Sequence, residues 1–179
     1  MALCHKIRAS LPAFDLWRIA VVLLALLAPA GLAASPLSNH LSDPKLLGSS
    51  TFRFLGLPIY DARLYTPGGA PFNWSEDFGL ELTYRRNIKK MALIDSTLEE
   101  MDRQGNSLPI RSELESCFQT ITPGDRYLAI SQGPDRVSYW FNGKMACTIA
   151  HRGIKRAFMS IFLGDRTRSA SFTRQLKGL

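Results

Sequence analysis

The sequence has few of the residues that build metal centres and nucleophilic active sites. It contains three cysteines and three histidines, and no Cys-x-x-Cys or His-x-x-x-His pair occurs. Zinc and related metals are usually held by closely spaced ligands of these types. Glycine-rich phosphate loops and serine nucleophile elbows are also missing. We therefore expect no metal, no cofactor and none of the common nucleophilic hydrolase sites.

The sequence also lacks a dense basic block, internal repeats and low-complexity segments. Its formal net charge of +7 is spread along the chain. Nucleic-acid binding depends on basic residues that cluster, so we expect no nucleic-acid partner. A mild positive excess can instead favour small anionic partners.

One long apolar run is present, near the N-terminus, "IAVVLLALLAPAGLA" at 19–33. Basic residues precede it, and Gly31 and Ala33 are small residues suited to a cleavage site. The run is short for a spanning helix, which needs about 20 apolar residues. The pattern predicts that 1–33 is an export signal and that the mature chain is periplasmic, with a net charge of +5. The alternative is an uncleaved anchor on the outer side of the inner membrane; no lipid-attachment cysteine follows the run.

Two cysteines, Cys117 and Cys147, remain after removal of this signal. In an oxidising compartment they could form a disulfide. The alternative is a pair of buried thiols that act as small apolar residues.

The first part of the mature chain predicts extended structure. Residues 34–50 are polar and broken by prolines, which is typical of an extended lead-in. In "TFRFLGLPIYDARLY" (51–65) the apolar residues change faces near Gly56 and Pro58. Glycine and proline inside a strand mark a bulge or bend, so we expect one long strand, bent in the middle. The alternating "FGLELTYR" (78–85) is expected to pair with it as a hairpin.

Two helices and a second hairpin are expected next. Apolar residues spaced by three and four predict a helix from Asn87 to Gly105 and another that starts at Ser107. Asn142-Gly143 lies between two alternating runs and is a strong hairpin signal. A two-residue turn there places Trp140 opposite Met145 and Ser138 opposite Cys147.

Both faces of this second hairpin are largely apolar, so something must cover each of them. The segment 154–162 has the apolar spacing of a helix and is the expected cover for the second face; a short last helix holds Phe172 and Leu176. The predicted fold class is α+β, an antiparallel sheet with helices packed on one side.

The order of these pieces resembles the chalcone isomerase-like family, in its bacterial exported branch. The resembling pieces are "FRFLGLPIYDARLY", "LELTYRRNI", "GDRYLAIS", "WFNGKMACTI", "AFMSIFLGDRT" and "SASFTRQLKG". They span nearly all of 51–179, which is the predicted domain. The resemblance implies an open-faced β-sandwich with an apolar cleft between a long sheet and a helical layer.

The resemblance implies two possible activities. Plant members of the family close a chalcone to a flavanone, and related members bind fatty acids without known chemistry. The plant enzymes use an arginine and a threonine near the first long strand, and a tyrosine further on. Arg53 stands near the arginine's place, but the threonine's place falls near Leu55 and the tyrosine's near Ile88 or Lys89. This departure counts against chalcone isomerase activity.

The candidate ligand-binding residues are Arg53, Tyr60, Tyr84 and Arg85. A guanidinium at Arg53 that points into the cleft can hold a carboxylate or enolate in two hydrogen bonds; the alternative is a solvent-facing arginine. The tyrosines are either cleft hydroxyls or core residues with one satisfied hydroxyl. Arg85 is either part of a basic rim or a solvated strand end.

Three functions remain open on this basis. The first is a binding module whose cleft takes a small apolar or amphipathic acid, such as a fatty acid. The second is an intramolecular lyase, or isomerase, of the chalcone–flavanone type. The third is a structural or partner-binding periplasmic protein with a closed cleft.

Overall fold

The computed structural model describes residues 35–179, and the predicted export signal lies outside them. Residues Ala34–Leu179 form one compact unit. Its core is a six-stranded antiparallel sheet whose strands follow sequence order: β1 (Pro44–Phe54), β2 (Leu57–Pro67), β3 (Gly79–Tyr84), β4 (Arg126–Ser131), β5 (Arg136–Phe141) and β6 (Lys144–Ala150).

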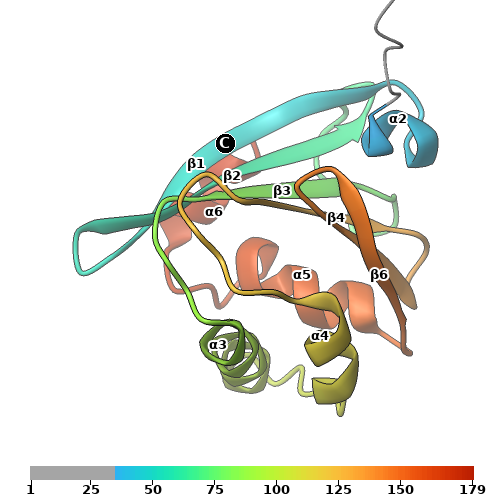
Figure 1. The fold of residues 1–179 in the computed structure, drawn as a ribbon. Coiled ribbons are helices and arrows are strands. Elements are labelled where there is room, and N and C mark those ends of the chain that lie inside the picture. Colours follow the sequence, from blue (N-terminus) through green and yellow to red (C-terminus); the bar gives the residue numbers. More distant parts are fainter. Residues whose placement is uncertain (1–34) are drawn as a thin grey trace, which may run out of the picture. The chain divides into compact units, whose positions relative to one another are not determined.

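The helices of this unit are α2 (Pro36–His40), α3 (Lys90–Arg103), α4 (Arg111–Cys117), α5 (Ile154–Leu163) and α6 (Ala170–Leu176). Figure 1 shows α3, α4 and α5 together on one side of the sheet. The α+β class, with an antiparallel sheet and helices packed on one side, is confirmed. In the described part of the chain, no helix has the length and apolar character needed to cross a membrane.

The segment 51–65 is a hairpin, so the prediction of one bent strand is wrong. Strands β1 and β2 pair antiparallel, with Phe54 opposite Leu57, and Leu55-Gly56 forms the turn between them. Both turn residues have positive φ, +49° and +80°. The apolar pattern changes faces because the chain reverses direction at the turn. A bulge within one strand would give the same pattern in the sequence. Most of β1 comes from the predicted lead-in at 34–50.

The two middle helices exist, but each starts later than predicted. Ile88 makes an isolated antiparallel bridge to Ile121, with backbone hydrogen bonds of 3.0 and 2.8 Å. This bridge holds the chain extended, so α3 begins at Lys90 and not at Asn87. The next helix begins at Arg111 rather than Ser107.

The main core lies between the sheet and the helical layer. Its central side chains are fully buried; they include Leu64, Leu80, Ile94, Met101, Leu114, Tyr139, Ile149 and Ile154. Helix α5 contributes Ala157, Phe158 and Phe162 on the same side. The predicted helix 154–162 therefore packs on this side of the sheet.

The opposite face of the sheet is covered by the predicted lead-in instead. Leu37 of α2 and Leu41 pack against Leu128, Ile130 and Trp140 as a second, smaller buried cluster. Strand β3 allows this close approach at Gly79, because a Cβ there would lie 2.5 Å from the Leu37 side chain. The expectation that 154–162 covers the second face is therefore corrected.

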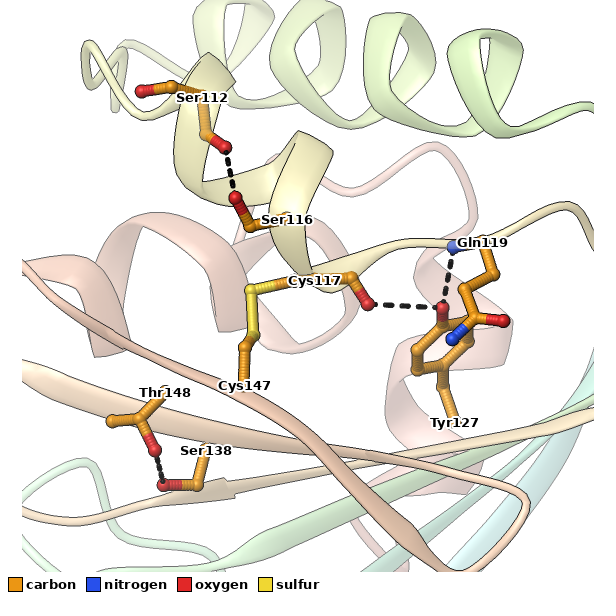
Figure 2. Close-up of a disulfide and its surroundings, with 8 residues drawn as sticks. All are labelled: Ser112, Ser116, Cys117, Gln119, Tyr127, Ser138, Cys147 and Thr148. Carbon is orange, nitrogen blue, oxygen red and sulfur yellow. Dashed lines mark hydrogen bonds between the residues drawn. A yellow bond between two sulfur atoms is a disulfide. The ribbon is translucent and has the colours of Figure 1, made fainter.

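The β5–β6 hairpin turns at Asn142-Gly143, as predicted, and Trp140 pairs with Met145. Beyond that pair a β-bulge shifts the register by one residue, so Tyr139 is opposite Cys147 and Ser138 is opposite Thr148. The predicted pair of Ser138 with Cys147 is wrong for this reason. The shift leaves Ser138 and Thr148 hydrogen bonded through their hydroxyls at 2.8 Å (Figure 2).

A disulfide joins Cys117, at the end of α4, to Cys147 on β6 (Figure 2). The two Cα atoms are 5.2 Å apart, and the cysteines are 30 residues apart in sequence. Beside it, the hydroxyl of Tyr127 accepts a hydrogen bond from the backbone N–H of Gln119 and donates to the carbonyl of Cys117. The α4 region is thus attached to the sheet by the disulfide and by two hydrogen bonds of the Tyr127 hydroxyl.

Replacing both Cys117 and Cys147 with serine is expected to lower the free energy of unfolding by about 3.5 kcal/mol. A bridge over a loop of this length restricts the unfolded chain by roughly that amount. Urea unfolding of the oxidised wild type and of the double variant measures the difference. Addition of reductant must lower the stability of the wild type and leave the variant unchanged; equal stability without reductant would contradict the bridge.

Leu41→Ala is expected to cost about 2–3 kcal/mol, because Leu41 is buried in the cluster on the outer face of the sheet. The matched control is Leu46→Ala, since Leu46 is half-exposed on β1 and should change stability by less than about 0.5 kcal/mol. Chemical denaturation compares the two. Equal, small losses would mean that the segment before β1 is not part of the folded core.

Candidate ligand cavity

A cavity of about 350 Å³ lies between the sheet and the helices α3, α5 and α6. Its wall is mainly aromatic and aliphatic; the apolar side chains include Phe52, Leu82, Ile88, Leu93, Phe118, Phe158 and Phe172. Small-molecule sites are typically concave, of roughly 300–1,000 Å³, and lined by apolar groups with a few polar ones. The cavity falls within this size class.

The ring of Tyr60 lies at the centre of the aromatic wall. It stacks on Phe52 of β1 at 5.1 Å between ring centroids and meets Tyr84 edge-on at 5.8 Å. From the helical side, Phe172 of α6 and Phe162 of α5 approach it at 6.0 and 6.1 Å. Edge-on aromatic pairs of this kind add stability beyond area burial. They give the cavity a rigid wall where strands and helices meet.

Four tyrosines line the cavity: Tyr60, Tyr84, Tyr127 and Tyr139. Burial raises the pKa of Tyr127 to about 12 and raises the pKa of the other three above the ordinary value for a phenol. All four are therefore neutral at physiological pH. A neutral phenol can donate one hydrogen bond and accept others, so these groups can bind polar atoms but supply no countercharge for an anion.

Tyr139 is the least satisfied of these phenols. Its side chain is 1% exposed, and its hydroxyl has no hydrogen-bond partner within residues 35–179. An unpaired buried hydroxyl costs about 1–3 kcal/mol, and such groups are rare in folded proteins. Tyr139 belongs to the cavity wall, but its hydroxyl oxygen is itself buried, so a partner from the cavity would reach it only after the wall rearranges.

A buried carboxylate, Glu100 of α3, forms the charged part of the wall. Arg168 Nε donates to Glu100 Oε2 at 2.6 Å, and Gln104 Nε2 donates to Oε1 at 3.0 Å. Arg103 also binds both oxygens of this carboxylate. Burial alone would raise the pKa of Glu100, but these hydrogen bonds outweigh it and hold the pKa below its ordinary value. Glu100 is therefore ionised. The two arginines that bind it, Arg103 and Arg168, carry two positive charges against its one negative charge.

Arg168 lines the cavity, and no other lysine or arginine of residues 35–179 does so. Its side chain is 40% exposed, so it lies where the cavity meets solvent. Its second contact, to Glu99, is a loose one of 3.8 Å. The fork of Arg168 is thus oriented through Nε by Glu100, while its terminal nitrogens are only weakly engaged.

The structure separates the four predicted site residues into two pairs. Tyr60 and Tyr84 line the cavity, whereas Arg53 and Arg85 do not. Arg53 donates to the carbonyl of Gly56 at 3.3 Å on the exposed hairpin. Arg85 is ion-paired with Asp61 at 2.7 Å. The expectation that Arg53 forms the cationic end of the cleft is corrected: its neighbours Phe52 and Phe54 line the cavity, and alternate side chains of a strand point to opposite faces.

The positions carried over from the plant enzymes are divided in the same way. Leu55, at the place of the threonine, is at the hairpin tip and outside the cavity, while Ile88 lines it. Arg168, Glu100 and Tyr139 were missed in sequence. For Glu100 a signal did exist, since it lies on the buried stripe of α3 with Ile94, Thr97 and Met101. A glutamate on a buried stripe requires cationic partners.

Tyr139→Phe is expected to leave the ligand-free protein as stable as the wild type, or to stabilise it by about 1 kcal/mol, because the substitution removes an unpaired hydroxyl. Tyr127→Phe is the matched control and should cost about 1 kcal/mol, since its hydroxyl is bonded to two backbone groups. Urea unfolding of delipidated protein measures both. A loss at Tyr139 equal to that at Tyr127 would show that the Tyr139 hydroxyl is bonded.

The sequence matches no family profile and no curated protein. Among solved structures, the fold is similar to the crystal structure of a fatty-acid binding protein from Arabidopsis thaliana, with a TM-score of 0.57. The two sequences are 12% identical, and the match covers 76% of this chain and 87% of that chain. At this identity the likeness concerns the fold alone, the open-faced sandwich of chalcone isomerase-like proteins.

Proposed function

We propose that this chain is an exported binding protein of the chalcone isomerase-like type, whose cavity holds the tail of an amphipathic carboxylic acid. The observation that carries the proposal is an apolar cavity of about 350 Å³ whose boundary carries one cationic side chain of residues 35–179, Arg168. The predicted export signal supports a periplasmic location and the bacterial exported branch of the family. The binding activity itself rests on the cavity.

The apolar wall accounts for the tail. Each methylene moved from water to an apolar site contributes about 0.8 kcal/mol, so a long alkyl chain gains affinity with length until the cavity is full. The aromatic side chains around Tyr60 present flat surfaces with little conformational freedom. Because these side chains are already ordered, little binding free energy is lost in ordering the protein.

Arg168 accounts for the acid group. A carboxylate buried without a cation is strongly disfavoured, and the phenols of the wall are neutral. The guanidinium of Arg168 can bind a carboxylate through its terminal nitrogens while Nε stays on Glu100. We therefore place the acid group at Arg168 and the tail towards Tyr139.

The fold comparison points in the same direction. The Arabidopsis thaliana protein is described as fatty-acid binding, and a long-chain fatty acid has the chemistry that this cavity selects. The isomerase alternative has less support, because Arg53 and Leu55, the positions it requires, lie on the hairpin outside the cavity. An absorbance assay with chalcone tests the isomerase directly.

Arg168→Gln is expected to weaken the binding of hexadecanoic acid by about tenfold or more, since a hydrogen bond to a charged group contributes about 1.5–3 kcal/mol. Binding of the methyl ester of the same acid should be nearly unchanged, because the ester carries no charge. Titration of delipidated protein with both compounds gives the two affinities. Mass spectrometry of ligand extracted from freshly purified protein shows what the cavity holds in the cell.

Arg53→Gln is the matched control, because Arg53 is an arginine outside the cavity; it should bind both compounds as the wild type does. The Tm of each variant checks the fold. Loss of acid and ester binding together in folded Arg168→Gln would contradict the assignment of the acid group. Absence of binding by the wild type would leave the structural or partner-binding alternative.

A further inference from the structure

The β1–β2 hairpin ends in an apolar tip. Figure 1 shows this hairpin projecting beyond the rest of the sheet, away from the helices. At its end Phe54 is 51% exposed, Leu55 is 87% exposed and Leu57 is 52% exposed. Single exposed apolar residues are ordinary, but three within four positions at a projecting tip form a patch. We call these three residues the apolar tip.

Leu55 is unfavourable for the turn that it occupies. The turns Leu55-Gly56 and Asn142-Gly143 have the same φ angles, +49° and +80°. Asparagine tolerates positive φ and is the favoured first residue of such a turn, whereas leucine is strained there. The same chain therefore uses the expected residue in one hairpin and an exposed leucine in the other. The turn itself does not explain this leucine.

Two cationic side chains, Arg53 and Arg86, lie at the base of the tip. Arg53 donates to the carbonyl of Gly56 at 3.3 Å, and Arg86 Nε donates to the carbonyl of Pro58 at 3.3 Å. Among the salt bridges of residues 35–179, none includes Arg53 or Arg86. An apolar end with two arginines beside it, neither paired with an acidic residue of 35–179, matches the interface of an anionic bilayer, where apolar groups enter the headgroup region and cations meet phosphates.

The tip is also continuous with the cavity. Phe54 is exposed at the tip and lines the cavity, and Ile59 of β2 lines the cavity as well. We propose that the apolar tip inserts into the surface of an anionic lipid bilayer, with Arg53 and Arg86 on the lipid phosphates. This places the cavity wall of the hairpin against the source of an apolar ligand. Insertion of the tip is a property of the free protein and does not depend on the ligand.

The test uses the full chain and vesicles of equimolar phosphatidylcholine and phosphatidylglycerol whose acyl chains carry bromine. Leu55→Trp places a fluorophore at the tip, and bromine quenches it only if it enters the bilayer. The matched control is Lys144→Trp, at an exposed position beside the other hairpin turn. Because both variants retain residues 1–34, any membrane contact of that segment affects them equally. Quenching is expected for the tip variant and, beyond the wild-type background, not for the control.

The charge part is tested with Arg53→Gln and Arg86→Gln in the Leu55→Trp chain. Each lost cation should weaken tip insertion about fivefold on the anionic vesicles and have little effect on pure phosphatidylcholine. Added salt should weaken insertion for the same reason.

Leu55→Asn tests the role of the apolar tip without destabilising the fold. It restores the favoured turn residue, so its Tm should equal or exceed that of the wild type, and hexadecanoic acid added from solution should bind normally. Transfer of the acid from vesicles should be slowed about tenfold or more, because loss of the leucine side chain weakens partitioning of the tip into the bilayer by about that factor. This last readout rests on the proposed function; the quenching does not.

Equal quenching at positions 55 and 144 would overturn the proposal. A second overturning result is a shift from dimer to monomer on Leu55→Asn in sedimentation without vesicles, with no quenching of the tip tryptophan. That result would assign the tip to a contact between copies of this chain.

Discussion

The structure depends on one constraint, which is that the sheet is apolar on both faces at β4 and β5 and each of these faces must be covered. On one face the short α2 segment closes directly onto Leu128, Ile130 and Trp140, helped by the missing side chain at Gly79. On the other face the cover is a layer of helices that meets large aromatic side chains. These rings fill the contact incompletely and leave the cavity. One face is thus closed for stability, and the other is open enough to hold a second molecule.

Much of the architecture could be predicted because it is encoded in local patterns. The alternation in β3, the Asn142-Gly143 turn and the apolar stripes of the helices each predict an element from a few neighbouring residues. The first hairpin could not be found in this way. Its turn begins with Leu55, and Pro58 follows, so the usual turn signal is missing and a bend looks equally good. That error also moved Arg53 into a cleft that it does not reach.

Residues of the candidate site were predictable only where the alternating pattern of one strand places them. Tyr60 and Tyr84 could be found because they lie on apolar strand faces. Arg168 and Glu100 are 68 residues apart in sequence and meet only through the tertiary fold, so no local pattern links them. The unpaired hydroxyl of Tyr139 is likewise a property of its surroundings. The β-bulge that sets the Tyr139 register is one inserted residue, which the alternating sequence around it does not reveal.

The position of the disulfide determines which wall of the cavity can move. The wall beside Phe118 and Tyr127 is attached to β6 through Cys117 and Cys147. The wall of α3 is joined to residues 167–169 chiefly by the contact of Glu100 with Arg168. A disulfide keeps its two segments joined, whereas an ion pair at a partly exposed guanidinium can break and re-form. One wall of the cavity is thus tethered covalently and the other is held by non-covalent contacts, so we expect ligand exchange to loosen the α3 side first.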